Sequence, residues 1–188
     1  MKKSLSLLLT AIITVSILSS CANKDTNVPE GFKEISDDAI GYDLYVPEDW
    51  ISDISTGITS AYFSNTDPSN ISMTSFELNN DVQSIEDYWK FYLPSLRALF
   101  PDLQFDNLPE DADPDQVTVG IPEQLKIDGV PALAYNYTGS MNGTAYKFYQ
   151  VITFKNATVY IFTYTAETTN YDAHIKDVVD ILANIKFD

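Results

Sequence analysis

Residues 123–166 read EQLKIDGVPALAYNYTGSMNGTAYKFYQVITFKNATVYIFTYTA, four runs rich in β-branched and aromatic residues. Their junctions are Asp128-Gly129, Asn142-Gly143 and Asn156-Ala157. Asp-Gly and Asn-Gly favour tight hairpins because both central residues of a type I′ turn have positive φ, and Asn-Ala is a weaker version of this signal. We therefore expect a four-stranded antiparallel meander over residues 123–128, 130–139, 144–155 and 158–166.

Apolar side chains recur at every second position of this segment, the period of a half-buried strand. On the second strand the shared face carries Leu133, Tyr135 and Tyr137, and on the third it carries Tyr146, Phe148, Ile152 and Phe154. Earlier in the chain, residues 42–46, 58–63 and 71–78 have strand composition.

Two other segments have a helical period. The first begins at Ser84, which with Asp87 resembles a capping box, and Glu86 and Lys90 pair four residues apart on its wet side. Pro94 also lies on that side and is expected to kink or split the helix. The apolar stripe of this helix comprises Ile85, Tyr88, Trp89, Tyr92, Leu93, Leu96, Leu99 and Phe100.

The second helix is expected to begin near Asn170. Its apolar face comprises Tyr171, Ile175, Val178, Val179, Leu182 and Ile185. Each helix has one face to bury, and the sheet is the available partner. The predicted fold class is therefore α+β, with a largely antiparallel sheet and helices on both faces, an α/β/α sandwich.

The first 20 residues have the composition of a secretory signal peptide: two lysines precede 17 uncharged residues, fewer than the ~20 apolar residues of a spanning helix. The run ends in LSSC, residues 18–21, which resembles the lipobox of bacterial lipoproteins. The resemblance implies that Cys21 receives a diacylglyceryl group and becomes the N-terminus. The alternatives are an ordinary signal peptide with a chance cysteine, or an uncleaved anchor.

This parse predicts a signal peptide over 1–20, a lipidated N-terminus and tether over 21–30, and one folded domain over 31–188. The tether spans at most ~30 Å, so the domain is expected at the extracytoplasmic face of a bacterial cell membrane, with the bilayer as a partner. With residues 1–20 removed, nine basic and 27 acidic residues remain, a formal charge of −18. Such a domain repels nucleic acid and anionic headgroups, so no nucleic-acid partner is expected.

Two stretches resemble a known family. Gly31-Phe32 followed by GYDLYVPEDW, residues 41–50, resembles the opening of PsbP-like domains, and residues 146–187 resemble their closing hairpin, helix and short final strand. The family includes the photosystem II subunit PsbP and bacterial envelope lipoproteins of PsbP-like or DcrB-like type. The resemblance implies an α/β/α sandwich, secretion and a non-catalytic binding or assembly role, and it brings no active site and no cofactor.

The sequence has few groups suited to catalysis. His174 is the one histidine, at the edge of the second apolar helix face, where a hydrogen-bonded structural role is expected. The stretch GSMNG, residues 139–143, departs from the nucleophile-elbow spacing and is explained by a hairpin. One cysteine and one histidine exclude an ordinary zinc site within one chain.

Two weaker binding signals remain open. Asp111, Asp113 and Asp115 alternate as at the start of a calcium loop, but the glycine and glutamate that an EF-hand requires are absent, so a solvated loop is the competing interpretation. Tyr45 and Tyr149 fall outside the apolar stripes and are candidate carbohydrate-stacking residues.

The leading functional expectation is a membrane-anchored lipoprotein with a non-catalytic binding or assembly-accessory role, whose partner is a protein or small molecule of unknown identity. One alternative is an envelope hydrolase that uses two carboxylates across a cleft. The other is a solute or metal receptor with a sizeable closed pocket.

Overall fold

The computed structural model describes residues 28–36, 40–53, 58–78, 82–109 and 119–188. Within these ranges the chain forms two helices, α1 Ile85–Leu99 and α2 Tyr171–Asn184. The strands in the same ranges are β1 Phe32–Glu34, β2 Tyr42–Asp43, β3 Tyr45–Pro47, β4 Ile51–Asp53, β5 Thr59–Tyr62, β6 Asn70–Glu77, β7 Gln104–Phe105, β8 Glu123–Ile127, β9 Val130–Met141, β10 Thr144–Lys155, β11 Thr158–Glu167 and β12 Lys186–Phe187.

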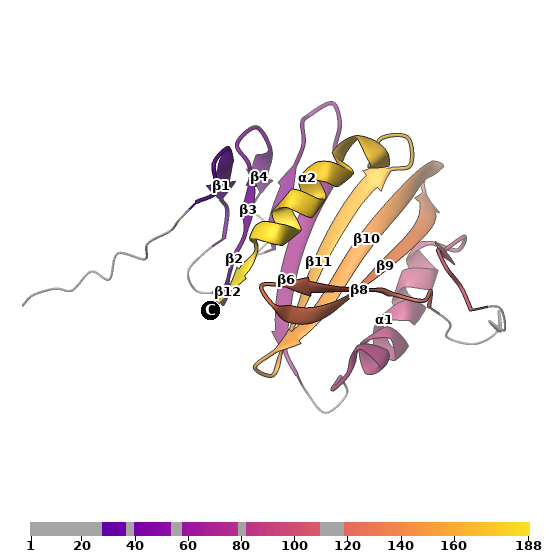
Figure 1. Cartoon of the computed structure of the whole chain (residues 1–188). Coiled ribbons are helices and arrows are strands. Elements are labelled where there is room, and N and C mark those ends of the chain that lie inside the picture. Colours follow the sequence, from indigo (N-terminus) through magenta and orange to yellow (C-terminus); the bar gives the residue numbers. More distant parts are fainter. Residues whose placement is uncertain (1–27, 37–39, 54–57, 79–81, 110–118) are drawn as a thin grey trace, which may run out of the picture.

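One large antiparallel sheet dominates the fold. Its strand order is β4-β5-β6-β11-β10-β9-β7, and β8 pairs with β9 on the same edge as β7. Helix α2 lies on one face of this sheet and α1 on the other (Figure 1). Two further sheets have two strands each: β1 pairs with β3, and β2 pairs with β12 near the C-terminus. This arrangement confirms the predicted α+β sandwich.

The four-stranded meander is confirmed, and its three turns explain why. Both central residues of each turn have positive φ: Asp128 48° and Gly129 79°, Asn142 53° and Gly143 84°, Asn156 50° and Ala157 63°. Strands β9 and β11 extend one or two residues beyond the predicted bounds, and β8 stops one residue earlier. The three turns therefore set which residues of the neighbouring strands pair. The length of each strand depends on how far that pairing continues.

Ala157 is the one turn residue of these six that is neither glycine, asparagine nor aspartate. An alanine in the left-handed region costs roughly 1–2 kcal/mol because Cβ approaches the backbone, and its side chain is exposed here. Ala157→Gly is therefore expected to raise the free energy of unfolding by about 0.5–1 kcal/mol, measured by urea denaturation. A lower stability for this variant would contradict the turn assignment.

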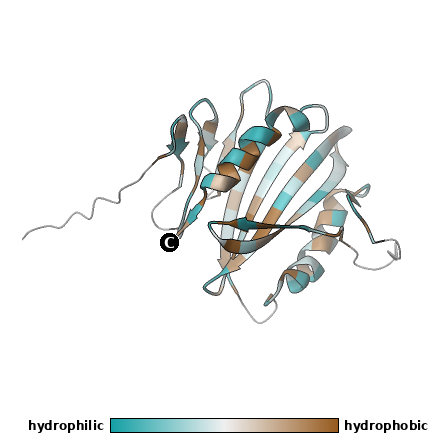
Figure 2. Ribbon diagram, viewed as in Figure 1, coloured by the Kyte–Doolittle hydropathy of each residue, from teal (hydrophilic) through white to brown (hydrophobic). Residues whose placement is uncertain are grey.

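The sheet separates two hydrophobic cores. One lies under α2 and includes Leu44, Trp50, Phe162 and Ile181, all at most 1% exposed. The other lies under α1 and is centred on aromatic residues, namely Trp89, Tyr135, Tyr137, Phe105 and Phe148. Hydrophobic and hydrophilic residues alternate along the strands between the two layers (Figure 2). The predicted faces of β9 and β10 both pack in the α1 core.

Helix α1 confirms most of its prediction. Ser84 is the N-cap and accepts a hydrogen bond from the Asp87 N–H at 3.0 Å, and the Glu86–Lys90 ion pair measures 3.2 Å. The helix is not split at Pro94, which is exposed inside a continuous helix. The prediction that Leu99 belongs to the buried apolar stripe is wrong, because its side chain is 55% exposed. The helix ends there, and the chain turns Phe100 into the core in its place.

Helix α2 also departs from its predicted face. Val179 is 56% exposed, whereas Ile181 is fully buried and His174 is 6% exposed. The buried face is centred on positions 171, 174, 178 and 181, which follow the 3-4-3 spacing of one helix face. Val179 is apolar but lies beyond its rim.

The predicted strand over residues 42–46 is wrong as a single element. Residues 42–43 form β2 and pair with β12, whereas residues 45–47 form β3 and pair with β1. Leu44 separates them and is fully buried. The short strands β1, β4 and β7 were not predicted, because runs of two or three residues have no readable period.

Candidate ligand-binding groove

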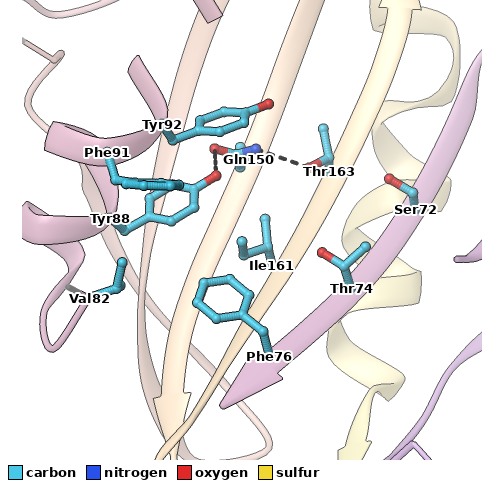
Figure 3. A pocket seen from close by; sticks show the side chains of 10 residues that line it. All are labelled: Ser72, Thr74, Phe76, Val82, Tyr88, Phe91, Tyr92, Gln150, Ile161 and Thr163. Atoms are coloured by element: carbon cyan, nitrogen blue, oxygen red, sulfur yellow. Dashed lines mark hydrogen bonds between the residues drawn. The ribbon is translucent and has the colours of Figure 1, made fainter. Parts of the chain in front are cut away.

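Helix α1 covers only part of its face of the sheet and leaves a groove along β6 and β11. The cavity has a volume of about 580 Å³. Its lining comes from the helix, the segment just before it and three adjacent strands (Figure 3) and comprises Ser72, Thr74, Phe76, Val82, Tyr88, Phe91, Tyr92, Gln150, Ile161 and Thr163.

Strand register sets the chemistry of the groove floor. Gln150 on β10 pairs with Thr163 on β11, and Thr163 pairs with Ser72 on β6, so three polar side chains form one row across the sheet. Paired residues in neighbouring strands point to the same face. The floor therefore has a polar end built from three strands.

The next rows become progressively apolar. In the row two residues from the polar one, Ile161 of β11 pairs with Thr74 of β6. In the row after that, Val159 pairs with Phe76. Val82 and Phe76 lie on the two sides of this end of the groove, while Gln150 lies between the tyrosines and Thr163 at the other end (Figure 3). The groove thus has one polar and one apolar end.

Aromatic side chains of α1 form the wall of the groove. Tyr88 and Tyr92 are one turn apart, so they share a helix face, and their rings stack at 5.2 Å with an interplanar angle of 21°. Phe91 is 70% exposed although it lines the groove. Its ring adds exposed apolar surface at the edge of the groove.

The polar end is neutral and hydrogen-bonded. Tyr88 donates to Gln150 Oε1 at 3.5 Å, and Gln150 Nε2 donates to Thr163 at 3.2 Å. Burial raises the pKa of Tyr88 and of Tyr92, so both hydroxyls stay protonated at neutral pH. Gln150 is only 3% exposed, and the two contacts of its amide, at 3.2 and 3.5 Å, use one of its two N–H donors.

The ten lining residues include hydroxyls and an amide but neither histidine nor carboxylate. A serine or threonine hydroxyl is a weak nucleophile without an adjacent base. The described lining therefore offers hydrogen-bonding groups and aromatic rings.

His174 lies on the opposite face of the sheet, in α2. Its Nε2 is 2.8 Å from Asp67 Oδ2, and its ring contacts Phe63 at 4.1 Å between centroids. Ser69 also donates to Asp67, at 2.6 Å. Burial alone would raise the pKa of Asp67, but hydrogen bonds from Ser69 and His174 lower it to about 2. His174 is thus buried and hydrogen-bonded, as expected, and its contact with Asp67 connects the β5–β6 loop to α2.

Several predicted sites lie elsewhere. Cys21 and the aspartates 111, 113 and 115 lie outside the described residues. Tyr45 is 4% exposed and Tyr149 is half-buried against the α2 core, so burial removes Tyr45 as a stacking platform. In the described ranges no group of three or more histidine, cysteine or acidic residues could hold a metal ion, and no helix is long and apolar enough to cross a membrane.

The groove itself was not predicted, although the sequence carried a signal for it. Gln150 interrupts the apolar face of β10 between Phe148 and Ile152, and Thr163 follows Ile161 on β11. Two polar interruptions become one site only when the register places them side by side.

Comparisons with solved structures identify the fold. Residues covering 91% of this chain superpose on 99% of the cyanobacterial PsbP protein CyanoP from Synechocystis sp. PCC 6803, with a TM-score of 0.58 at 14% identity. The chain has a PsbP-like fold. No family model and no curated protein matches the sequence.

Two further structures share this PsbP-like fold. LpqN, described as involved in cell envelope biogenesis of Mycobacterium tuberculosis, aligns with a TM-score of 0.54 and 16% identity, over 82% of this chain and 89% of LpqN. A structure from Bacteroides thetaiotaomicron aligns with a TM-score of 0.54 and 16% identity over 85% of this chain. This chain spans about half, 49%, of that protein.

Proposed function

We propose that this chain is a lipid-anchored, extracytoplasmic accessory protein that binds a ligand in the groove beside α1 and catalyses nothing. The observation that carries the proposal is the neutral groove, which combines a buried amide, hydroxyls and aromatic rings and has neither a base nor a carboxylate among its ten described lining residues. The PsbP-like fold, and the description of LpqN as an envelope-biogenesis protein, are consistent with an accessory role.

The anchoring part rests on LSSC at residues 18–21. In this proposal Cys21 carries the lipid, and the acidic domain is held near the outer surface of the cell membrane. Two or more acyl chains hold a protein firmly at a bilayer, whereas one gives reversible binding.

The groove is tested with two tryptophan substitutions in adjacent positions of β6. Thr74 points into the groove, whereas Ser75 is exposed outside it. Thr74→Trp should fill the groove and Ser75→Trp should leave it open. The wild type and both variants are purified from native membranes, and organic extracts are compared by mass spectrometry.

A compound that co-purifies with the wild type and Ser75→Trp, and is depleted at least about tenfold with Thr74→Trp, is the expected result. Equal amounts with all three proteins would contradict binding in the groove. Turnover in a broad hydrolase screen that Thr74→Trp abolishes would contradict the non-catalytic role.

A further inference from the structure

The position of polar and apolar rows in the groove restricts what the groove can hold. Neighbouring strands lie ~4.8 Å apart and same-face residues of one strand ~6.7 Å apart, so the polar row is ~10 Å wide and the three rows span ~13 Å. The volume of about 580 Å³ falls within the roughly 300–1,000 Å³ of small-molecule pockets. These dimensions and the order of the rows suit a small molecule with one polar and one apolar end.

Charge restricts the occupant further. None of the ten described residues that line the groove is charged at neutral pH. An ion that entered would lose hydration without gaining a counter-charge, which is costly. The formal net charge of −16 also disfavours the approach of anions. An uncharged compound meets neither penalty.

Hydrogen bonding indicates the kind of polar end. Gln150 offers an N–H, and the hydroxyls of Ser72, Thr74 and Thr163 can each donate or accept. Hydroxyl and amide groups match this set without carrying charge. At the other end, Phe76, Val82 and Ile161 offer contacts suited to an alkyl chain (Figure 3).

We infer that the groove binds an uncharged amphiphile, with a hydroxylated or amide head on the row Gln150, Thr163 and Ser72 and an apolar chain directed past Ile161 towards Phe76. This inference rests on the proposed function and names the ligand class for the same groove. A free amphiphile and a neutral membrane lipid share this chemistry.

Three amphiphiles with ten-carbon chains test the charge selection. The full chain carrying Cys21→Ser, which prevents lipid attachment at that position, is titrated by calorimetry with 1-monodecanoylglycerol, decanoate or decyltrimethylammonium below their micelle concentrations. The neutral compound is expected to bind at least about tenfold more tightly than either ion. Equal binding of all three, or tighter binding of an ion, would overturn the inference.

Variants locate the binding and assign the polar end. Gln150→Leu is expected to weaken monodecanoylglycerol about two- to tenfold, while Gln124→Leu on the exposed surface of β8 leaves it unchanged. Ser72→Lys is expected to reverse the selection by strengthening decanoate at least about tenfold. Circular dichroism confirms that each variant is folded. Failure of both Gln150→Leu and Ser72→Lys to change binding would place the ligand elsewhere.

A second arm distinguishes the two sources. The same protein is incubated with phosphatidylcholine vesicles that contain a fluorescent diacylglycerol, and the vesicles are removed by sedimentation. Fluorescence that stays with the protein and is lost in Thr74→Trp supports a membrane lipid, whereas binding of monodecanoylglycerol alone supports a free amphiphile. Binding of neither overturns the inference. If decanoate binds best and Thr74→Trp blocks it, the groove still binds a ligand and only the inferred class fails.

Discussion

Gly139→Ala is expected to lower the free energy of unfolding by about 1–3 kcal/mol, although alanine usually suits a strand better than glycine. A Cβ at position 139 would lie 2.7 Å from Phe100 Cβ and 2.8 Å from its Cγ. The Cβ atom of Phe100 is fixed by the backbone, so rotation of the side chain cannot remove the shorter of these contacts. Phe100 is 5% exposed and caps α1 through an N–H bond to Leu96 O at 2.9 Å. The end of α1 would therefore have to shift away from β9.

A double-mutant cycle checks that this contact is the cause. Phe100→Ala removes two of the three close atoms, Cγ and Cδ1, so Gly139→Ala should cost at least about 1 kcal/mol less in that background. The four proteins are compared by urea denaturation. A Gly139→Ala variant as stable as the wild type would contradict the close packing of α1 on the sheet.

Asp67→Asn is expected to destabilise the chain by roughly 2 kcal/mol at neutral pH. The pKa of Asp67 falls from 3.8 to about 2 in the folded chain, and each pKa unit corresponds to about 1.4 kcal/mol. Asparagine keeps the shape of the side chain but replaces the charged acceptor that faces Ser69 and His174.

The pH dependence has a defined sign. Because the folded pKa of Asp67 is lowered, its contribution is present above about pH 4 and is lost as the pH falls towards 2. The stability difference between the wild type and Asp67→Asn should therefore shrink over that interval, as measured by urea denaturation at several pH values. A difference that stays constant from pH 6 to pH 2 would show that the Asp67 charge does not stabilise the loop.

The meander was predictable because its information is local. Asp128-Gly129 and Asn142-Gly143 specify their turns within two residues, and the alternation between them places the strands. The capping residue of α1, Ser84, was recognised for the same reason. Local turn and cap chemistry therefore accounts for most of the α+β prediction.

The remaining features depend on contacts between distant segments. Residues 42–47 divide into β2 and β3 because their partners are β12 and β1, which lie at opposite ends of the folded chain. Val179 could not be told from the buried residues of α2 by its own apolarity. The partner of His174 is 107 residues away along the chain.

The groove is the clearest example of a feature that depends on contacts between distant segments. Ser72, Gln150 and Thr163 come from three strands, and their adjacency follows from the pairing of β6 with β11 and of β11 with β10. The sequence carried each polar residue but not the row.

The central claim is that the face of the sheet beside α1 is the binding site. Its most direct test is a titration of the chain carrying Cys21→Ser with 1-monodecanoylglycerol, followed by two-dimensional nitrogen–proton NMR. The account predicts saturable shifts of the Gln150 side-chain amide and of backbone amides in β6, β11 and the first half of α1, with His174 and α2 unaffected. Shifts confined to α2 or to the β4–β5 edge, or no shifts at all, would contradict it.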